Sequence, residues 1–141
     1  MLIAVPRETL PGENRAPLVP DSVKKLVRAG ADVTIEAGMG AGAGFADSDY
    51  QEVGASVNPD RQQLLGSADI VLRLHKPTLD EVDLLKAGSV HVSFLDPFNE
   101  RELVEKMAAK NVAAISMEMI PRITRSQKMD ALSSQANLAG Y

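Results

Sequence analysis

The chain has 141 residues, of which 45% are hydrophobic, a formal net charge of −4 and no cysteine. This length suits one domain with a single core, and the absence of cysteine excludes disulfides and thiolate metal sites. Two histidines make no credible metal site. No apolar run approaches the roughly 20 residues of a membrane-spanning helix. No basic stripe or secretory pattern occurs, so we expect a cytoplasmic protein without a nucleic-acid partner.

Apolar runs of strand length alternate with helical patterns along the chain. The first strand ends at Pro6, and Gly30 ends the first long helix. Strands are predicted at residues 2–5, 32–36, 70–74, 90–95 and 112–117, and helices at 20–29, 45–55, 61–65, 79–85 and, with Asn99 as its cap, 100–110. The alternation predicts an α/β fold with a doubly wound, mostly parallel sheet, Rossmann-like or flavodoxin-like.

A glycine-rich run at residues 38–44 follows the second predicted strand. It does not fit the pattern G-x-G-x-x-G, because the third glycine position holds Ala43 or, counted from Gly40, Phe45. The segment after it is short and polar, unlike the long apolar helix that packs beside a bound pyrophosphate. We therefore expect these glycines to serve chain turning and close packing. The chain then lacks a nucleotide-binding unit of its own.

Two loop residues are candidate ligand contacts. Arg15 lies in a proline- and glycine-containing loop after the first strand, where a guanidinium can clamp a carboxylate or a phosphate. A structural pair with Glu8 or Glu13 is an equally good interpretation of Arg15. His75 stands at the end of the strand at 70–74 and can hydrogen-bond a ligand there.

The most unusual sequence is residues 121–141. Pro121 begins a polar, basic loop, and a helical pattern follows that Gly140 ends. Gln127, Asp130 and Ser133 are three residues apart and would share one face of that helix. The unpaired N–H groups of a helix start suit a ligand that needs hydrogen bonds. Spacing alone favours the alternative, a capped helix with a solvated polar side.

The segment RITRSQKMDALSSQANLAGY resembles the end of the first subdomain of the NAD(H)-binding component of proton-translocating NAD(P) transhydrogenase. The N-terminal motifs IAVPRE, PGENR and APLVP follow a pattern shared with alanine dehydrogenase, so the resemblance spans essentially the whole chain. It implies that an Arg-Gln-Asp loop, here Arg122, Gln127 and Asp130, with Ser133 beside it, lies over the nicotinamide of NAD(H). These side chains would orient the ring, and none would act as an acid or a base.

The same resemblance implies hydride transfer between NAD(H) and NADP(H), coupled to proton translocation. NADP(H) would be bound by a partner, and membrane components would hold the subunit, a homodimer when complete, at the inner face of the cytoplasmic membrane. Residues 1–126 would form the α/β subdomain, and residues 127–141 would begin an interdomain helix leading to a Rossmann domain. We then expect the chain to be the leading portion of a longer subunit, inactive alone and weak in binding NAD(H).

Two positions separate this chain from alanine dehydrogenases, which carry a substrate-binding Lys and a catalytic His where this sequence has His75 and Asp96. A carboxylate does not replace an imidazole in acid-base chemistry near neutral pH without a large pKa shift. The difference favours the transhydrogenase interpretation. An alanine-dehydrogenase-like oxidoreductase and a non-catalytic binding or assembly module remain the alternatives.

Overall fold

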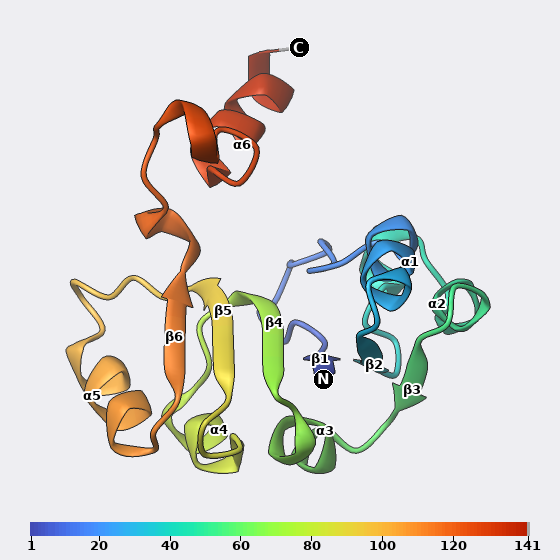
Figure 1. Cartoon of the computed structure of the whole chain (residues 1–141), viewed down its shortest axis with the longest axis horizontal. Helices are drawn as coiled ribbons and strands as arrows, with labels where there is room; N and C mark the ends of the chain where they lie inside the picture. The colour runs from blue at the N-terminus through green and yellow to red at the C-terminus, as the bar shows by residue number, and fades with distance from the viewer. Residues whose placement is uncertain (141) are drawn as a thin grey trace.

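Six short segments form one parallel sheet in the computed structural model, which describes residues 1–140 (Figure 1). The strands are β1 (Leu2–Val5), β2 (Asp32–Glu36), β3 (Ser56–Asn58), β4 (Ile70–His75), β5 (Val90–Phe94) and β6 (Ala113–Ser116). Their order is β3-β2-β1-β4-β5-β6, and all neighbouring strands are parallel. The direction of winding reverses between β1 and β4, and open α/β sheets bind ligands outside such a reversal.

Helices cover both faces of the sheet. They are α1 (Pro20–Arg28), α2 (Asp47–Glu52), α3 (Arg61–Ser67), α4 (Leu79–Leu84), α5 (Arg101–Ala109) and α6 (Ala131–Gly140), with short 3₁₀ turns η1 (Ala41–Ala43), η2 (Met117–Met119) and η3 (Thr124–Ser126). Successive strand residues point to opposite faces. Ile3 and Val5 accordingly join the core under α1 and α2, while Ala4 joins the core under α3, α4 and α5. The predicted doubly wound α/β fold is confirmed.

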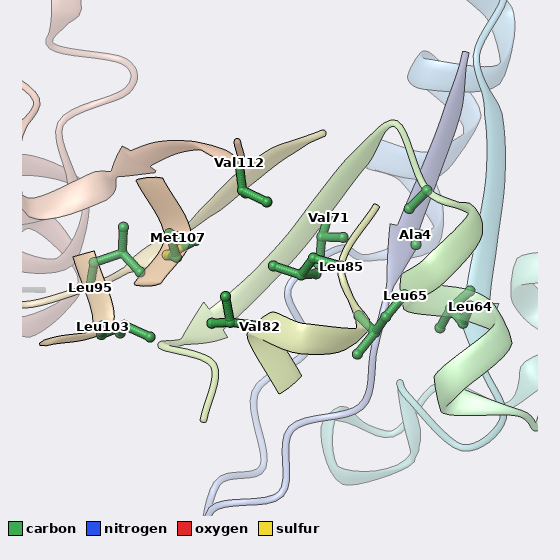
Figure 2. Close-up of a cluster of buried hydrophobic side chains, with 11 residues drawn as sticks. Ala4, Leu64, Leu65, Val71, Val82, Leu85, Leu95, Leu103, Met107 and Val112 are labelled. Carbon is green, nitrogen blue, oxygen red and sulfur yellow. The ribbon is translucent and has the colours of Figure 1, made fainter. Parts of the chain in front are cut away.

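The larger core cluster lies under α3, α4 and α5, where Figure 2 shows apolar side chains from these helices meeting those of the sheet. Each of its members is almost completely buried. The cluster consists of Ala4, Leu64, Leu65, Ala68, Val71, Val82, Leu85, Leu95, Leu103, Met107 and Val112.

Largely buried ion pairs tie the carboxyl ends of β2 and β4 to the helices. Arg61 at the start of α3 pairs with Glu36 of β2 and, through Nη2 at 2.6 Å, with Oε1 of Glu81 in α4. The second oxygen of Glu81 lies 2.9 Å from Nη1 of Arg73 in β4. Burial alone would raise the pKa of Glu81, but the charge of Arg73 and hydrogen bonds from Thr78 and Arg61 outweigh it and lower the pKa to about 2.

The glycine run serves turning and packing, as expected. Gly38 and Gly44 have φ values of +76° and +84°, and a Cβ on Gly42 would lie 2.9 Å from the Cα of Asn14. The run therefore holds the loop at residues 6–19 closely against the end of β2.

Three sequence predictions need correction. Strand β3 was not predicted, because its three residues are too few to show an alternation. Asn99 does not cap α5: the N-cap is Glu100, and the Asn99 side chain donates to the Asp96 carboxylate at 2.9 and 3.1 Å. The last helix begins at Ala131, because η3 and a turn occupy residues 124–129. Tyr141, where the predicted interdomain helix was to continue, lies outside the described residues.

Candidate functional site

The loop between β1 and α1 lies at the reversal point of the sheet and carries Arg15. Its neighbour Glu13 accepts hydrogen bonds from Nε and Nη2 of Arg15 at 2.8 and 2.6 Å. Nε2 of His75, at the end of β4, lies 2.7 Å from Oε2 of the same carboxylate. The hydrogen bonds from Arg15 hold the pKa of Glu13 well below its ordinary value. The sequence allowed Arg15 either to contact a ligand or to form a structural pair with Glu8 or Glu13. The structure shows the pair with Glu13.

This loop does not form a phosphate site. Helix α1 begins with Pro20, and no side chain caps its start. Two carboxylates, Glu8 and Glu13, instead face the end of β4, where they bind the backbone N–H of Leu74 and the ring of His75. The end of the sheet at which dinucleotide-binding folds receive a pyrophosphate therefore carries two carboxylates of the chain itself, which disfavour a second anion there.

A cavity of about 370 Å³ lies between the end of β5, η2 and the start of α6. Arg122 and Asp130 both line it, together with an apolar wall that includes Phe94, Met117 and Ile120. An adjoining cavity of about 590 Å³ shares this wall and extends to Arg15 and Lys128. The structure thus brings Arg122 and Asp130 to one cavity and Arg15 to its neighbour.

Asp130 is buried and caps α6. Its Oδ1 accepts the backbone N–H of Leu132 at 2.9 Å, and its Oδ2 accepts the hydroxyl of Ser133. The hydrogen bond from Ser133 keeps the pKa of Asp130 below its ordinary value. Ser133 therefore stands beside Asp130, as expected. The capped helix that spacing favoured is also observed.

Gln127 does not share that helix face. It follows η3 in an exposed turn, four residues before α6 begins, and lines neither cavity. The prediction of one common face for Gln127, Asp130 and Ser133 is wrong, because the helical period starts only at Ala131.

Two cavity residues were missed by sequence reasoning. Glu118 and Gln135 line the cavity that holds Arg122 and Asp130. Glu118 is a single acid just after a strand, and Gln135 is one polar residue of a weakly patterned helix, so neither carries a sequence signal.

Residues 1–140 contain neither a membrane-spanning helix nor a cluster of metal ligands. No helix in this range has the length and apolarity needed to span a bilayer. No three acidic or histidine side chains of the same range gather closely enough to hold a metal ion.

The parallel sheet, its strand order and the helices on both faces define a Rossmann-like α/β domain, and a cavity with both charged and apolar residues lies beyond β5. The chain belongs to the family of the alanine dehydrogenase/PNT N-terminal domain, which its residues 4–139 match. It is 43% identical over 141 residues to NAD(P) transhydrogenase subunit alpha of Cereibacter sphaeroides, covering 100% of this chain and 27% of that protein. The resemblance seen in the sequence is confirmed.

Solved structures give the same result. The crystal structure of transhydrogenase from Sinorhizobium meliloti matches with a TM-score of 0.93 and 38% identity, over 100% of this chain and 42% of that one. An L-alanine dehydrogenase matches with a TM-score of 0.79 and 38% identity, over 84% of this chain and 32% of that one. The chain thus spans less than half the length of each of these transhydrogenases.

Proposed function

We propose that this chain is the leading portion of an NAD(P) transhydrogenase alpha subunit and forms one wall of its NAD(H) hydride-transfer site. The observation that carries the proposal is the cavity beyond β5, where Arg122 and Asp130 meet an apolar wall. The similarity of the whole chain to transhydrogenases supports it. Hydride would pass between NAD(H) here and NADP(H) on a partner component.

The cavity offers what a nicotinamide ring requires. A guanidinium donates to a carboxamide oxygen, a carboxylate accepts from its NH₂ group, and Phe94 and Met117 offer apolar contact to the ring. Each oxygen of Asp130 keeps acceptor capacity beyond the single hydrogen bond that it receives. Gln127, exposed in its turn, would approach a bound ring from the solvent side. The contribution of these residues is orientation, which shortens the approach of the hydride to its acceptor.

The wider assembly belongs to the same proposal. Residues 1–126 would be the α/β subdomain, and α6 would lead toward a Rossmann domain that seats the dinucleotide. Partner components would bind NADP(H), couple hydride transfer to proton translocation and hold a dimeric subunit at the inner face of the cytoplasmic membrane. The present chain would then be inactive alone.

The test is Arg122→Ala in the complete transhydrogenase, measured by single-turnover hydride transfer. We expect the rate to fall by about 10- to 100-fold, because a small misplacement of the ring is costly. Arg101→Ala is the control, because Arg101 is exposed on α5 and its ion pair is with Glu105 of the same helix. An unchanged rate with Arg122→Ala would contradict the proposal. Pyruvate-dependent oxidation of NADH by the complete protein would instead support the alanine-dehydrogenase alternative.

A further inference from the structure

Strands β4 and β5 end in the same way, with two successive backbone N–H groups directed at a carboxylate. At β4 the N–H groups of Leu74 and His75 donate to Glu8. At β5 the N–H of Leu95 donates to Oε1 and Oε2 of Glu118 at 3.0 and 3.3 Å, and the N–H of Asp96 also donates to Oε1. Successive N–H groups of this kind form small anion-binding concavities.

The concavity at β5 depends on an uncommon backbone conformation. Asp96 has a φ of +52°, a left-handed conformation that is unfavourable for a residue other than glycine, although less so for Asp and Asn than for other residues. Hydrogen bonds to a charged carboxylate are among the strongest in proteins, so Glu118 can offset that cost. Desolvation would raise the pKa of Glu118, but the nearby Ser116 hydroxyl and then backbone N–H groups, among them those of Asp96 and Leu95, outweigh it and lower the pKa.

Glu118 also joins two regions of the molecule. It lies in η2, directly before the segment that carries Arg122 and Asp130. Within residues 1–140, all side-chain hydrogen bonds between residues 117–140 and the rest of the chain come from Glu118. Ser126 and Asp130 are the buried residues of that segment, and the apolar side chains that adjoin Phe94 of β5, Met117 and Ile120, are only half-buried.

We infer that Glu118 is a positioning residue: by fixing η2 on the end of β5, it sets where Arg122 and Asp130 stand over the cavity. This role rests on the proposed function, because the importance of that position comes from the hydride-transfer site. Glu118 lines the same cavity. It need not touch the cofactor to affect transfer.

The first measurement is backbone amide hydrogen exchange in the complete subunit with Glu118→Gln. Oε1 accepts both N–H groups, and a glutamine can keep that oxygen in place, but it loses the negative charge that strengthens both hydrogen bonds and the longer contact of Oε2 with Leu95. Exchange at Leu95 and Asp96 should therefore accelerate about 10-fold. Glu8→Gln is the matched comparison and should affect Leu74 and His75 instead. Unchanged exchange at Leu95 and Asp96 would overturn the inference.

The second measurement is steady-state hydride transfer by the same variant in the complete enzyme. We expect kcat to fall about 10-fold while KM for NADH changes less than about 2-fold, because misplacement slows the transfer step more than binding. Glu105→Gln, which removes an exposed carboxylate from α5, should leave both values unchanged. If Glu118→Gln does not assemble, Glu118→Asp, which keeps the charge but shortens the reach, should show the same effects.

The two proposals can fail separately. Unchanged transfer in Glu118→Gln, with slowed transfer in Arg122→Ala, would overturn the positioning role alone. Unchanged transfer in both variants would overturn the proposed function and the positioning role together. Faster exchange at Leu95 and Asp96 in Glu118→Gln, with slower hydride transfer in both variants, would support the proposed function and the positioning role.

Discussion

The sheet body, residues 1–116, and the segment at 117–140 are stabilised differently. The body contains two clusters of almost fully buried apolar side chains and a chain of ion pairs between strands and helices. In the segment, Met129, Leu132 and Leu138 are 56%, 53% and 73% exposed. Figure 1 shows α6 standing away from the sheet, with a short stretch of chain between them.

This difference shows that a segment can form a regular helix without being packed firmly against the rest of the molecule. A ten-residue helix is marginal in water by itself and gains most of its stability by packing one face. Helix α6 has no buried residue, so its hydrogen-bonded start and the Glu118 contacts contribute a larger share of its stability than such contacts do in the body.

The largest contrast should come from removing a leucine side chain in each region. Leu65 is 1% exposed, so Leu65→Ala should lower the free energy of unfolding by about 3–5 kcal/mol through lost burial and the cavity left behind. Leu138→Ala, at a mostly exposed position, should change it by less than about 0.5 kcal/mol. Urea unfolding followed by circular dichroism measures both. Equal effects would show that α6 packs as firmly as the body.

A second prediction concerns acid. The pKa of Glu81 is lowered to about 2 in the fold, so its carboxylate stabilises the body above its ordinary pKa of about 4.5, and that stabilisation is lost as pH falls toward 2. Glu81→Gln should cost about 2–3 kcal/mol at pH 7 and progressively less below pH 5. Urea midpoints at pH 7, 5 and 3 measure this. For Glu105→Gln, the urea midpoint should depend on pH in the same way as for the unmodified chain. The same pH dependence for Glu81→Gln would contradict the lowered pKa of Glu81.

The smallest effect should be confined to the segment. Asp130→Ala removes the cap of α6 and should reduce the local stability of the helix by about 1 kcal/mol, without changing the unfolding of the body. Amide exchange at residues 131–140 measures the local change, and Gln127→Ala, outside the helix, is the control. A shift in the body's unfolding transition would mean that the two regions are coupled.

The body was predicted well from sequence, because its elements repeat their patterns over several residues. Leu2–Val5 and Asp32–Glu36 form strands with the predicted limits, and the predicted helix at 20–29 differs from α1 by one residue. Burial on both faces of a parallel sheet leaves near-continuous apolar runs, which end visibly at proline, glycine or charge. Strand β3 was not predicted, because it is an edge strand of three residues that include Ser56 and Asn58.

The candidate site was predicted less completely. Arg122 and Asp130 were named from a family motif, and the structure brings them to one cavity. Gln127 was placed on the wrong element, because a 3₁₀ turn and a following turn have no periodicity to distinguish them from a helix start. Glu118 was missed for a different reason. Its partners are backbone N–H groups 22 and 23 positions away, and a backbone N–H cannot be recognised from the type of residue that carries it.

The strand order also bears on how the chain is made. Strand β1 is synthesised before the other five strands but lies in the middle of the sheet, and its Ile3 pairs with Ile70 of β4. At a synthesis rate of about 5–20 residues per second, β1 waits roughly 3–13 s for that neighbour. During this interval β1, β2 and β3 can form a three-stranded unit with one open edge, a surface that other nascent chains could pair with.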